Sequence, residues 1–247
     1  MTYIPTDGFV IITGASRGIG AAIAYECIER NINIAVSCVH NYSLLEDMKK
    51  YASEKGVKCF IYQGNMGDFA AAHEFIDNAA KELGTPFALV NNAGISKIGL
   101  LQDMSPEDWN EIISCNLTSV YNCSHSVIPE MLHNHSGRIV NIASVWGNIG
   151  ASMEVAYSAT KGGVNSLTKA LSKELAPSNI SVNAVACGIV DTDMNKCFTE
   201  EDIEAICDEI PAGRMCTPKE VAEVVLHIID SSPYLTGQII TVDGGWT

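Results

Sequence analysis

The stretch TGASRGIG, residues 13–20, joins an apolar, β-rich run at 9–13 to a helical pattern at 19–30. Glycines at 14, 18 and 20 permit a tight turn and let the backbone approach a pyrophosphate, which a helix N-terminus attracts. Their spacing is G-x-x-x-G-x-G, and the absence of a following Gly-Lys-Ser/Thr excludes a nucleotide-triphosphate loop. An ordinary glycine-rich turn is the alternative. The stretch therefore predicts a strand, a turn and a helix that together bind a dinucleotide.

Strand and helix patterns alternate along the rest of the chain. Buried parallel strands are nearly continuous apolar runs, so we expect an α/β fold with a doubly wound sheet of about seven parallel strands and helices on both faces. A bend is expected near Pro129, inside the longest helical region. The expected strands are 9–13, 32–37, 57–62, 87–91, 138–142, 180–185 and 238–242, and the expected helices are 19–30, 43–55, 68–83, 105–133, 157–175 and 217–230.

The composition narrows the class of protein. Among 247 residues, Lys+Arg 15 against Asp+Glu 29 give a formal net charge of −14, and 47% of residues are hydrophobic. This is typical of a compact globule rather than a disordered chain. The sequence shows no basic patch for nucleic acid, no apolar run long enough to cross a bilayer, and no signal peptide in residues 1–8. We therefore expect a cytoplasmic protein that binds neither nucleic acid nor membrane.

The nine cysteines are scattered and form no C-x-x-C pair. In such a chain they are mostly small buried hydrophobic residues. The nearest approach to a metal cluster is Cys123-x-His125 followed by His133-x-His135, which exposed histidines at a helix end explain equally well. We predict no metal site.

Tyr157 and Lys161 lie four residues apart in a helical pattern and so share one helix face. An ammonium beside a phenol favours the phenolate and lowers the tyrosine pKa. The pair therefore predicts a proton donor and acceptor for reduction of a carbonyl or oxidation of an alcohol. The same spacing also occurs on ordinary solvated helices.

Five features occur together in one order: TGASRGIG, Asn91-Asn92-Ala93-Gly94, Asn116, Ser144 and Tyr157-x-x-x-Lys161. In this order they resemble the short-chain dehydrogenase/reductase family over nearly the whole chain, most of all its 3-oxoacyl-[acyl-carrier-protein] reductase type. The resemblance implies an NAD(P)-dependent oxidoreductase with a single Rossmann-type domain over 1–247. Its dinucleotide-binding part would span about 8–150 and its catalytic and substrate part about 140–247.

The resemblance also implies catalytic roles. Tyr157 would protonate the carbonyl oxygen as hydride arrives, and Lys161 would lower its pKa and hold the nicotinamide ribose. Ser144 would hydrogen-bond the same oxygen, which stabilises developing charge. Asn116 would hold a water that links Lys161 to solvent. Taken alone, Ser144 is also compatible with a turn residue and Asn116 with a polar group inside a helix.

The cofactor is expected to be NADP(H), with NAD(H) as the alternative. NAD enzymes place an acid after the second strand, whereas this chain has Ser37-Cys38-Val39-His40 there. Arg17 attracts a 2′-phosphate that a carboxylate would repel. The expected cofactor-binding residues are Gly14, Ser16, Arg17, Gly18, Ile19, Gly20, Asn65, Met66, Asn92, Ala93, Gly94, Tyr157, Lys161, Gly188, Val190 and Thr192.

The chain departs from the family at Cys187-Gly188, where Pro-Gly is usual. Because proline fixes φ, cysteine would leave this turn looser and place a thiol near the cofactor. We expect weaker cofactor preorganisation and inhibition by thiol reagents. A tolerated small residue is the alternative.

Three functional hypotheses follow: a 3-oxoacyl thioester reductase, in fatty acid biosynthesis; a reductase or dehydrogenase of a sugar, steroid or other small ketone; and a non-catalytic, cofactor-sensing relative. Acyl-carrier protein is a candidate partner, although a charge of −14 opposes docking of an acidic carrier. The family resemblance implies a homotetramer or homodimer. Residues 194–212 would cover the substrate, and the candidate substrate residues are Ser144, Trp146, Met153, Tyr157 and Met194.

Overall fold

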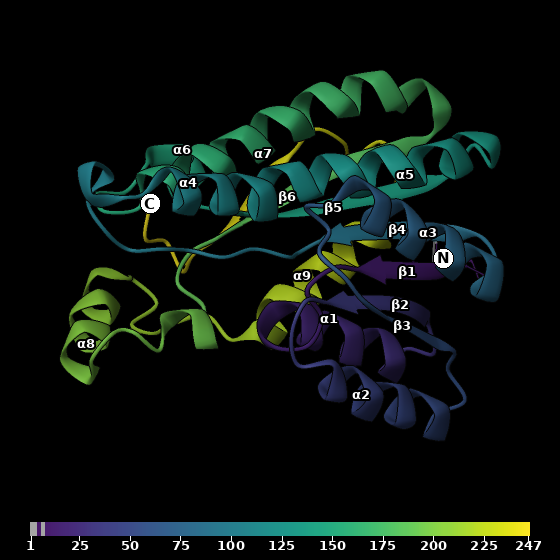
Figure 1. The fold of residues 1–247 in the computed structure, drawn as a ribbon, viewed down its shortest axis with the longest axis horizontal. Helices are drawn as coiled ribbons and strands as arrows, with labels where there is room; N and C mark the ends of the chain where they lie inside the picture. Colours follow the sequence, from purple (N-terminus) through teal and green to yellow (C-terminus); the bar gives the residue numbers. More distant parts are fainter. Residues whose placement is uncertain (1–3, 6–7) are drawn as a thin grey trace.

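The computed structural model describes residues 4, 5 and 8–247, so most of the segment tested above for a signal peptide lies outside the described residues. Seven parallel strands form one sheet in the order β3-β2-β1-β4-β5-β6-β7 (Figure 1). This confirms the predicted α/β fold. The strands are β1 (Phe9–Ile12), β2 (Asn33–Cys38), β3 (Cys59–Gln63), β4 (Pro86–Asn91), β5 (Gly137–Ser144), β6 (Ile180–Cys187) and β7 (Ile239–Val242).

Helices cover both faces of the sheet. Figure 1 shows α1, α2 and α9 below it and α3, α4, α5 and α7 above it, while α8 stands apart at one end. No helix among the described residues is long and apolar enough to cross a membrane. The helices are α1 (Gly18–Glu29), α2 (Tyr42–Glu54), α3 (Phe69–Leu83), α4 (Pro106–Ile113), α5 (Ser119–His133), α6 (Trp146–Ile149), α7 (Val155–Leu175), α8 (Glu200–Glu209) and α9 (Pro218–Ile229).

Strand β1 shows why its sequence is apolar throughout. Val10 and Ile12 are buried in the core under α1 and α9, whereas Phe9 and Ile11 are buried in the core under α3 and α5. A parallel strand covered on both faces has no polar side to present. The continuous apolar run therefore follows from the layered arrangement.

The long helical region at 105–133 is interrupted between α4 and α5. Helix α5 continues through Pro129, and the irregularity is a π-helical turn at Ser114–Thr118, between α4 and α5. Such a turn contains an extra residue and often marks a functional site. Here it carries Asn116, whose amide is bonded to the loop after β4. This tertiary contact was not visible in the sequence, and the bend expected near Pro129 stays a prediction.

Strands β1 and β4 are neighbours, although β2 and β3 lie between them in the chain. The chain reverses its direction of winding here, and ligands of such sheets bind beyond the carboxyl ends of strands at this point. The glycine-rich loop follows β1, and Asn92-Ala93-Gly94 follows β4. The fold thus brings together two of the sequence motifs.

Candidate active site

A cavity of about 670 Å³ lies at the carboxyl ends of the strands. Its wall includes the glycine-rich loop, the end of β2, the loop after β4, the end of β5 with α6, the start of α7, the segment after β6 and the C-terminal Trp246. Its lining includes Gly14, Ser16, Arg17, Gly18, Ile19, Asn92, Ala93, Gly94, Ser144, Trp146, Tyr157, Lys161, Gly188, Val190, Thr192 and Met194.

The glycine-rich loop is packed directly against the loop after β4. Gly14 has φ +66°, and a Cβ atom there would lie 2.9 Å from Ala93 Cα. The Asn92 side-chain amide donates to the carbonyls of Thr13 (2.9 Å) and Gly14 (3.0 Å). Gly20 does not line the cavity. It packs beneath this contact, where an added Cβ atom would lie 2.4 Å from the Gly14 carbonyl oxygen. These glycines are required by close backbone approach.

This end of the site fits a dinucleotide. The loop leads into the N-terminus of α1, which favours a pyrophosphate. Beside it, a smaller hollow is lined by Ser37, Asn65 and Met66. The Ser37 hydroxyl is buried and has no hydrogen-bond partner among the described residues, so a bound polar group would satisfy it. Met66 is itself buried in the core, and its carbonyl accepts from Asn122.

Arg17 is the cation beside the end of β2. The cavity wall there contains Cys38, Val39 and His40, with no carboxylate from this stretch. The Arg17 guanidinium lies 3.3 Å from the Asp193 carboxylate, on the segment after β6. This ion pair joins the two sides of the cavity.

Tyr157, Lys161 and Ser144 converge on the cavity from α7 and β5. The Lys161 ammonium is buried and donates to the Ile142 carbonyl at 2.8 Å. It lies 5.5 Å from the centre of the Tyr157 ring. Ser144 ends β5, shares a hydrogen bond with the Tyr157 phenol, and accepts one from the Trp146 N–H.

The pKa values of the pair differ from the expectation. Burial raises the pKa of the Tyr157 phenol, and the nearby Cys187 and Glu154 raise it further, while the hydrogen bond with Ser144 opposes them. Burial also lowers the pKa of Lys161 to about 8. Desolvation therefore outweighs the predicted lowering of the tyrosine pKa by the lysine. The phenol is protonated at neutral pH.

Asn116 is fully buried in the π-helical turn. Its amide forms two 2.8 Å hydrogen bonds with the Ile95 backbone, one to the N–H and one to the carbonyl. Gly94 lies between Asn116 and Lys161, because a Cβ there would be 3.4 Å from the Asn116 oxygen and 3.6 Å from the lysine nitrogen. Asn116 thus holds the loop after β4 against α7.

The segment after β6 forms one side of the cavity. The Val190–Cys216 bridge closes its base, where Asp191 N donates to the Cys216 carbonyl at 2.9 Å. Helix α8 was not predicted, although Thr199 and Asp202 form a capping box at its start. That T-x-x-D pattern with acids in the first turn is a readable helix signal.

The predicted substrate residues fall into two groups. Trp146 and Met194 line the cavity, whereas Met153 is exposed and lies outside the lining. The cavity therefore does not support Met153 as a substrate residue: with φ +63° it occupies a left-handed turn before α7. The lining residues that the sequence analysis missed include Ser96, Glu154 and Trp246.

Cys187 lies in the cavity wall but is buried, and burial raises its pKa to about 12. A thiol in this state is a poor nucleophile at neutral pH. Cys197, by contrast, is exposed and lines the same cavity. Among the described residues, no group of three or more His, Cys, Asp or Glu is arranged to hold a metal. His125 instead contacts the rings of Phe69 and Tyr121.

Comparison with known proteins gives consistent matches. The family model for short chain dehydrogenases matches residues 8–203. The 3-oxoacyl-[acyl-carrier-protein] reductase FabG of Staphylococcus aureus is 38% identical over 236 residues, covering 95% of this chain and 96% of the relative. The FabG of Vibrio harveyi is 35% identical, with 95% of each chain covered. The oxidoreductase YmfI of Bacillus subtilis is 38% identical, covering 96% of this chain and 97% of the relative.

Proposed function

This chain belongs to the short-chain dehydrogenase family and is an NAD(P)-dependent oxidoreductase, and on that premise we propose that it reduces a 3-oxoacyl thioester with NADPH. The observation that carries the proposal is the shared cavity. Tyr157, Ser144 and Lys161 line the same space as the glycine-rich loop, so a cofactor held by the loop and a substrate held at Tyr157 would meet there.

We propose that Tyr157 is the proton donor. NADPH, when bound, supplies the hydride that reduces the carbonyl carbon. The protonated phenol of Tyr157 gives its proton to the carbonyl oxygen, and the C=O bond becomes the C–OH of a secondary alcohol. Its raised pKa suits an acid that acts in the reducing direction. Ser144, already bonded to the phenol, would donate to the same oxygen and stabilise its developing charge.

Lys161 and Asn116 would support this proton transfer. With a pKa of about 8, Lys161 is mostly an ammonium at pH 7, and its charge favours the phenolate left after the transfer. Its bond to the Ile142 carbonyl fixes the side chain within reach of the ribose of a bound cofactor. Asn116 positions the loop after β4 beside this lysine.

Preference for NADPH is supported by the charges at the end of β2. Arg17 lines the cavity there, and the residues that follow β2 contribute no carboxylate to its wall. A guanidinium binds phosphate through two parallel hydrogen bonds, whereas the ribose 2′-hydroxyl of NADH needs an acceptor at this place.

The acyl substrate is supported by the apolar side of the cavity. Trp146 and Trp246 meet edge to face with ring centres 5.0 Å apart, and Phe198 and Ile206 line the same space. Such a wall would take an acyl chain. The similarity to 3-oxoacyl-[acyl-carrier-protein] reductases, at 35–38% identity, points to the same class.

A second candidate, reduction of a sugar, steroid or other small ketone, is favoured by one observation. Lys97 is an exposed base in the cavity lining that would receive an acidic carrier protein, but it is bonded to Asp108 and lies 4.0 Å from Glu111. Its charge is therefore already compensated. Together with the net charge of −14, this weakens the electrostatic case for carrier docking.

The test is oxidation of NADPH at 340 nm with acetoacetyl-N-acetylcysteamine, with NADH in parallel. Turnover is expected with NADPH and is expected to fall by about 10²–10⁴-fold in Tyr157→Phe, which removes the proton donor. Absence of turnover with retained NADPH binding would overturn the acyl substrate and favour the small-ketone class. With carrier-bound substrate, activity that falls as salt rises would support docking on basic residues.

We also propose assembly into a homotetramer or homodimer. Trp109, Tyr121 and Leu132 expose large apolar side chains along α4 and α5, and β7 is an edge strand of the sheet. Faces of this kind are typical of subunit contacts. Light scattering coupled to gel filtration measures the mass directly, and a monomer at micromolar concentration would contradict the proposal.

A further inference from the structure

A carboxylate shares the cavity wall with Tyr157. Glu154 lies three residues before it, at the residue that caps the N-terminus of α7. The side chain is half-buried, and the Ser96 hydroxyl, on the loop after β4, donates to it. No motif of the sequence singled out Glu154, and the reaction proposed above does not use it.

Backbone contacts hold Glu154 in place. Its carbonyl accepts from the Ser158 N–H at 2.8 Å, which begins the hydrogen bonding of α7. The residue before it, Met153, has φ +63°, and its carbonyl accepts from the Gly99 N–H at 2.8 Å. The turn is thereby bound to the loop after β4 through Gly99 and Ser96 and to α7 through Ser158. Glu154 is a fixed feature of the cavity wall rather than a mobile surface acid.

Its negative charge is compensated only weakly. Among the described residues, no Lys, Arg or His forms an ion pair with Glu154. The other carboxylate in the lining, Asp193, is paired with both Arg17 and Lys196. The charge of Glu154 reaches Tyr157, because it contributes to the raised pKa of the phenol.

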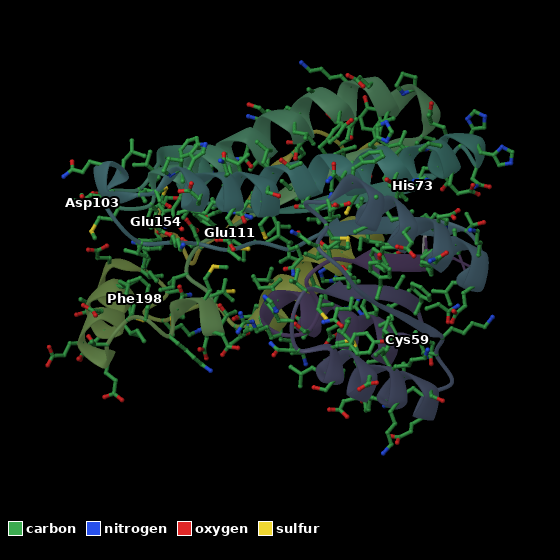
Figure 2. The ribbon with its side chains drawn as sticks, viewed as in Figure 1. Cys59, His73, Asp103, Glu111, Glu154 and Phe198 are labelled. Atoms are coloured by element: carbon green, nitrogen blue, oxygen red, sulfur yellow. The ribbon has the colours of Figure 1, made fainter. Side chains whose placement is uncertain are left out.

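The cavity lining also contains apolar side chains. In Figure 2, Glu154 lies on the side of α4 and α7, and Phe198 lies beside α8 at the same end of the molecule. Phe198 and Glu154 both line the cavity. A ketone bound at Tyr157 would share this cavity with the apolar ring of Phe198 and with the Glu154 carboxylate, which has no ion-pair partner among the described residues and acts on the Tyr157 phenol. A second carboxylate near the carbonyl would be repelled, more strongly than in water because the cavity is partly dehydrated.

We propose that Glu154 determines substrate specificity by excluding ketones with a carboxylate beside the reacting carbonyl, while admitting neutral thioesters and esters of the same skeleton. The inference rests on the proposed function in that it places the carbonyl at Tyr157. It explains how a 3-oxoacyl thioester would be distinguished from the free 3-oxo acid that its hydrolysis yields.

The test compares acetoacetyl-N-acetylcysteamine with acetoacetate in the wild type, Glu154→Gln and Glu154→Asp. Glutamine keeps the shape and can still accept from Ser96, so the fold is expected to persist, and a melting curve checks it. In Glu154→Gln, kcat/KM for acetoacetate is expected to rise about tenfold or more, because the neutral amide removes the repulsion between like charges. The kcat/KM for the thioester is expected to change less than about threefold, since the thioester carries no charge. Glu154→Asp keeps the charge and is expected to keep the exclusion.

Glu111→Gln is the matched control. It removes the same charge at the same end of the molecule, but Glu111 is exposed and lies outside the cavity lining (Figure 2). Its substrate ratio is expected to equal that of the wild type. An unchanged ratio in Glu154→Gln, or an equal change in Glu111→Gln, would overturn the proposal.

Failure of the proposed function can be distinguished from failure of the Glu154 proposal. If the wild type turns over no thioester, the 3-oxoacyl assignment fails. The ratio of kcat/KM for a neutral ketone to that for an anionic ketone is then measured with ethyl levulinate and levulinate.

The pH profile of reduction provides a second readout. Its alkaline limb is expected at lower pH in Glu154→Gln, because removal of the negative charge stabilises the phenolate. A limb that does not move would contradict a charge effect at Tyr157.

Discussion

The Arg17 guanidinium lies 3.3 Å from the Asp193 carboxylate, so the glycine-rich loop is paired with the segment that covers the cavity. The same guanidinium is the group proposed to bind the 2′-phosphate of NADPH. Asp193 also contacts Lys196, and both partners of the Arg17 pair are partly exposed. Exposed pairs of this kind contribute about 0–1 kcal/mol, so a phosphate can displace the carboxylate.

Arg17→Ala is expected to weaken NADPH binding about 10–100-fold, since charge-assisted bonds of this kind contribute about 1.5–3 kcal/mol. NADH binding is expected to change less than about threefold. Fluorescence titration of each cofactor measures both constants. Asp193→Asn should have the opposite, smaller effect and favour NADPH. An equal loss of affinity for NADPH and NADH in Arg17→Ala would show that Arg17 does not bind the 2′-phosphate.

Reduction and oxidation are expected to depend differently on pH. Burial raises the pKa of Tyr157, so the phenol needed for carbonyl reduction is present across the neutral range. Alcohol oxidation needs the phenolate instead, and its rate should increase with pH through the neutral and alkaline range. Initial rates in both directions with saturating cofactor test this. An oxidation rate independent of pH would contradict Tyr157 as the proton-transfer group.

Lys161 is expected to make stability depend on pH. Its pKa is about 8 in the folded chain and 10.5 when unperturbed, so between these values the unfolded chain binds one more proton. Stability of the wild type should therefore rise with pH relative to Lys161→Met, by up to about 1.4 kcal/mol per pH unit in this window. Urea unfolding of both proteins at pH 7.5–10.5 gives the difference. If the free energies of unfolding of the two proteins depend on pH in the same way, the pKa of Lys161 is not lowered in the folded chain.

Thiol reagents are expected to act through Cys197. It is exposed and lines the cavity, whereas Cys187 is buried with a pKa of about 12. Inhibition by N-ethylmaleimide should disappear in Cys197→Ser and persist in Cys187→Ser. Mass spectrometry of the modified peptides identifies the alkylated residue. If Cys187→Ser instead resisted inhibition by N-ethylmaleimide, Cys187 would be the reactive thiol, as the sequence predicted.

Gly20 is expected to tolerate no side chain. A Cβ there would lie 2.4 Å from the Gly14 carbonyl and 2.5 Å from the Asn92 amide, so the loop backbone would have to move. Gly20→Ala should cost about 1–3 kcal/mol of stability and weaken cofactor binding. Gly99→Ala is the control, because no atom lies within 4 Å of its added Cβ. Thermal melting with and without NADPH compares them.

The sequence predicted the parts of the molecule that depend on local pattern. The apolar runs gave the strands, and the glycine spacing gave the loop beside Asn92, because steric limits act on neighbouring residues. The residues that were missed depend on distant partners. Glu154 is held by Ser96, and Trp246 packs on Trp146, contacts that link segments far apart in the chain. Neither periodicity nor spacing records such pairs.

Misplaced expectations had the same cause. The π-helical turn in the long helical region was not expected, because the bonds of Asn116 to Ile95 join segments far apart in the chain. The lysine was expected to dominate the tyrosine pKa, but burial of both groups outweighed it. Degree of burial is a property of the assembled fold, and a single sequence gives only its average.

The bridge between Val190 and Cys216 has a consequence for how this scaffold diversifies. It fastens both ends of the intervening residues to one point beside the sheet, with Cys216 N donating to the Ile189 carbonyl at 3.0 Å. A change in length or composition between those ends would leave this attachment in place. Beyond Asp193, which is paired with Arg17, the insert is thus the part of the chain in which a different acyl or polar pocket can evolve while the cofactor side of the cavity is kept.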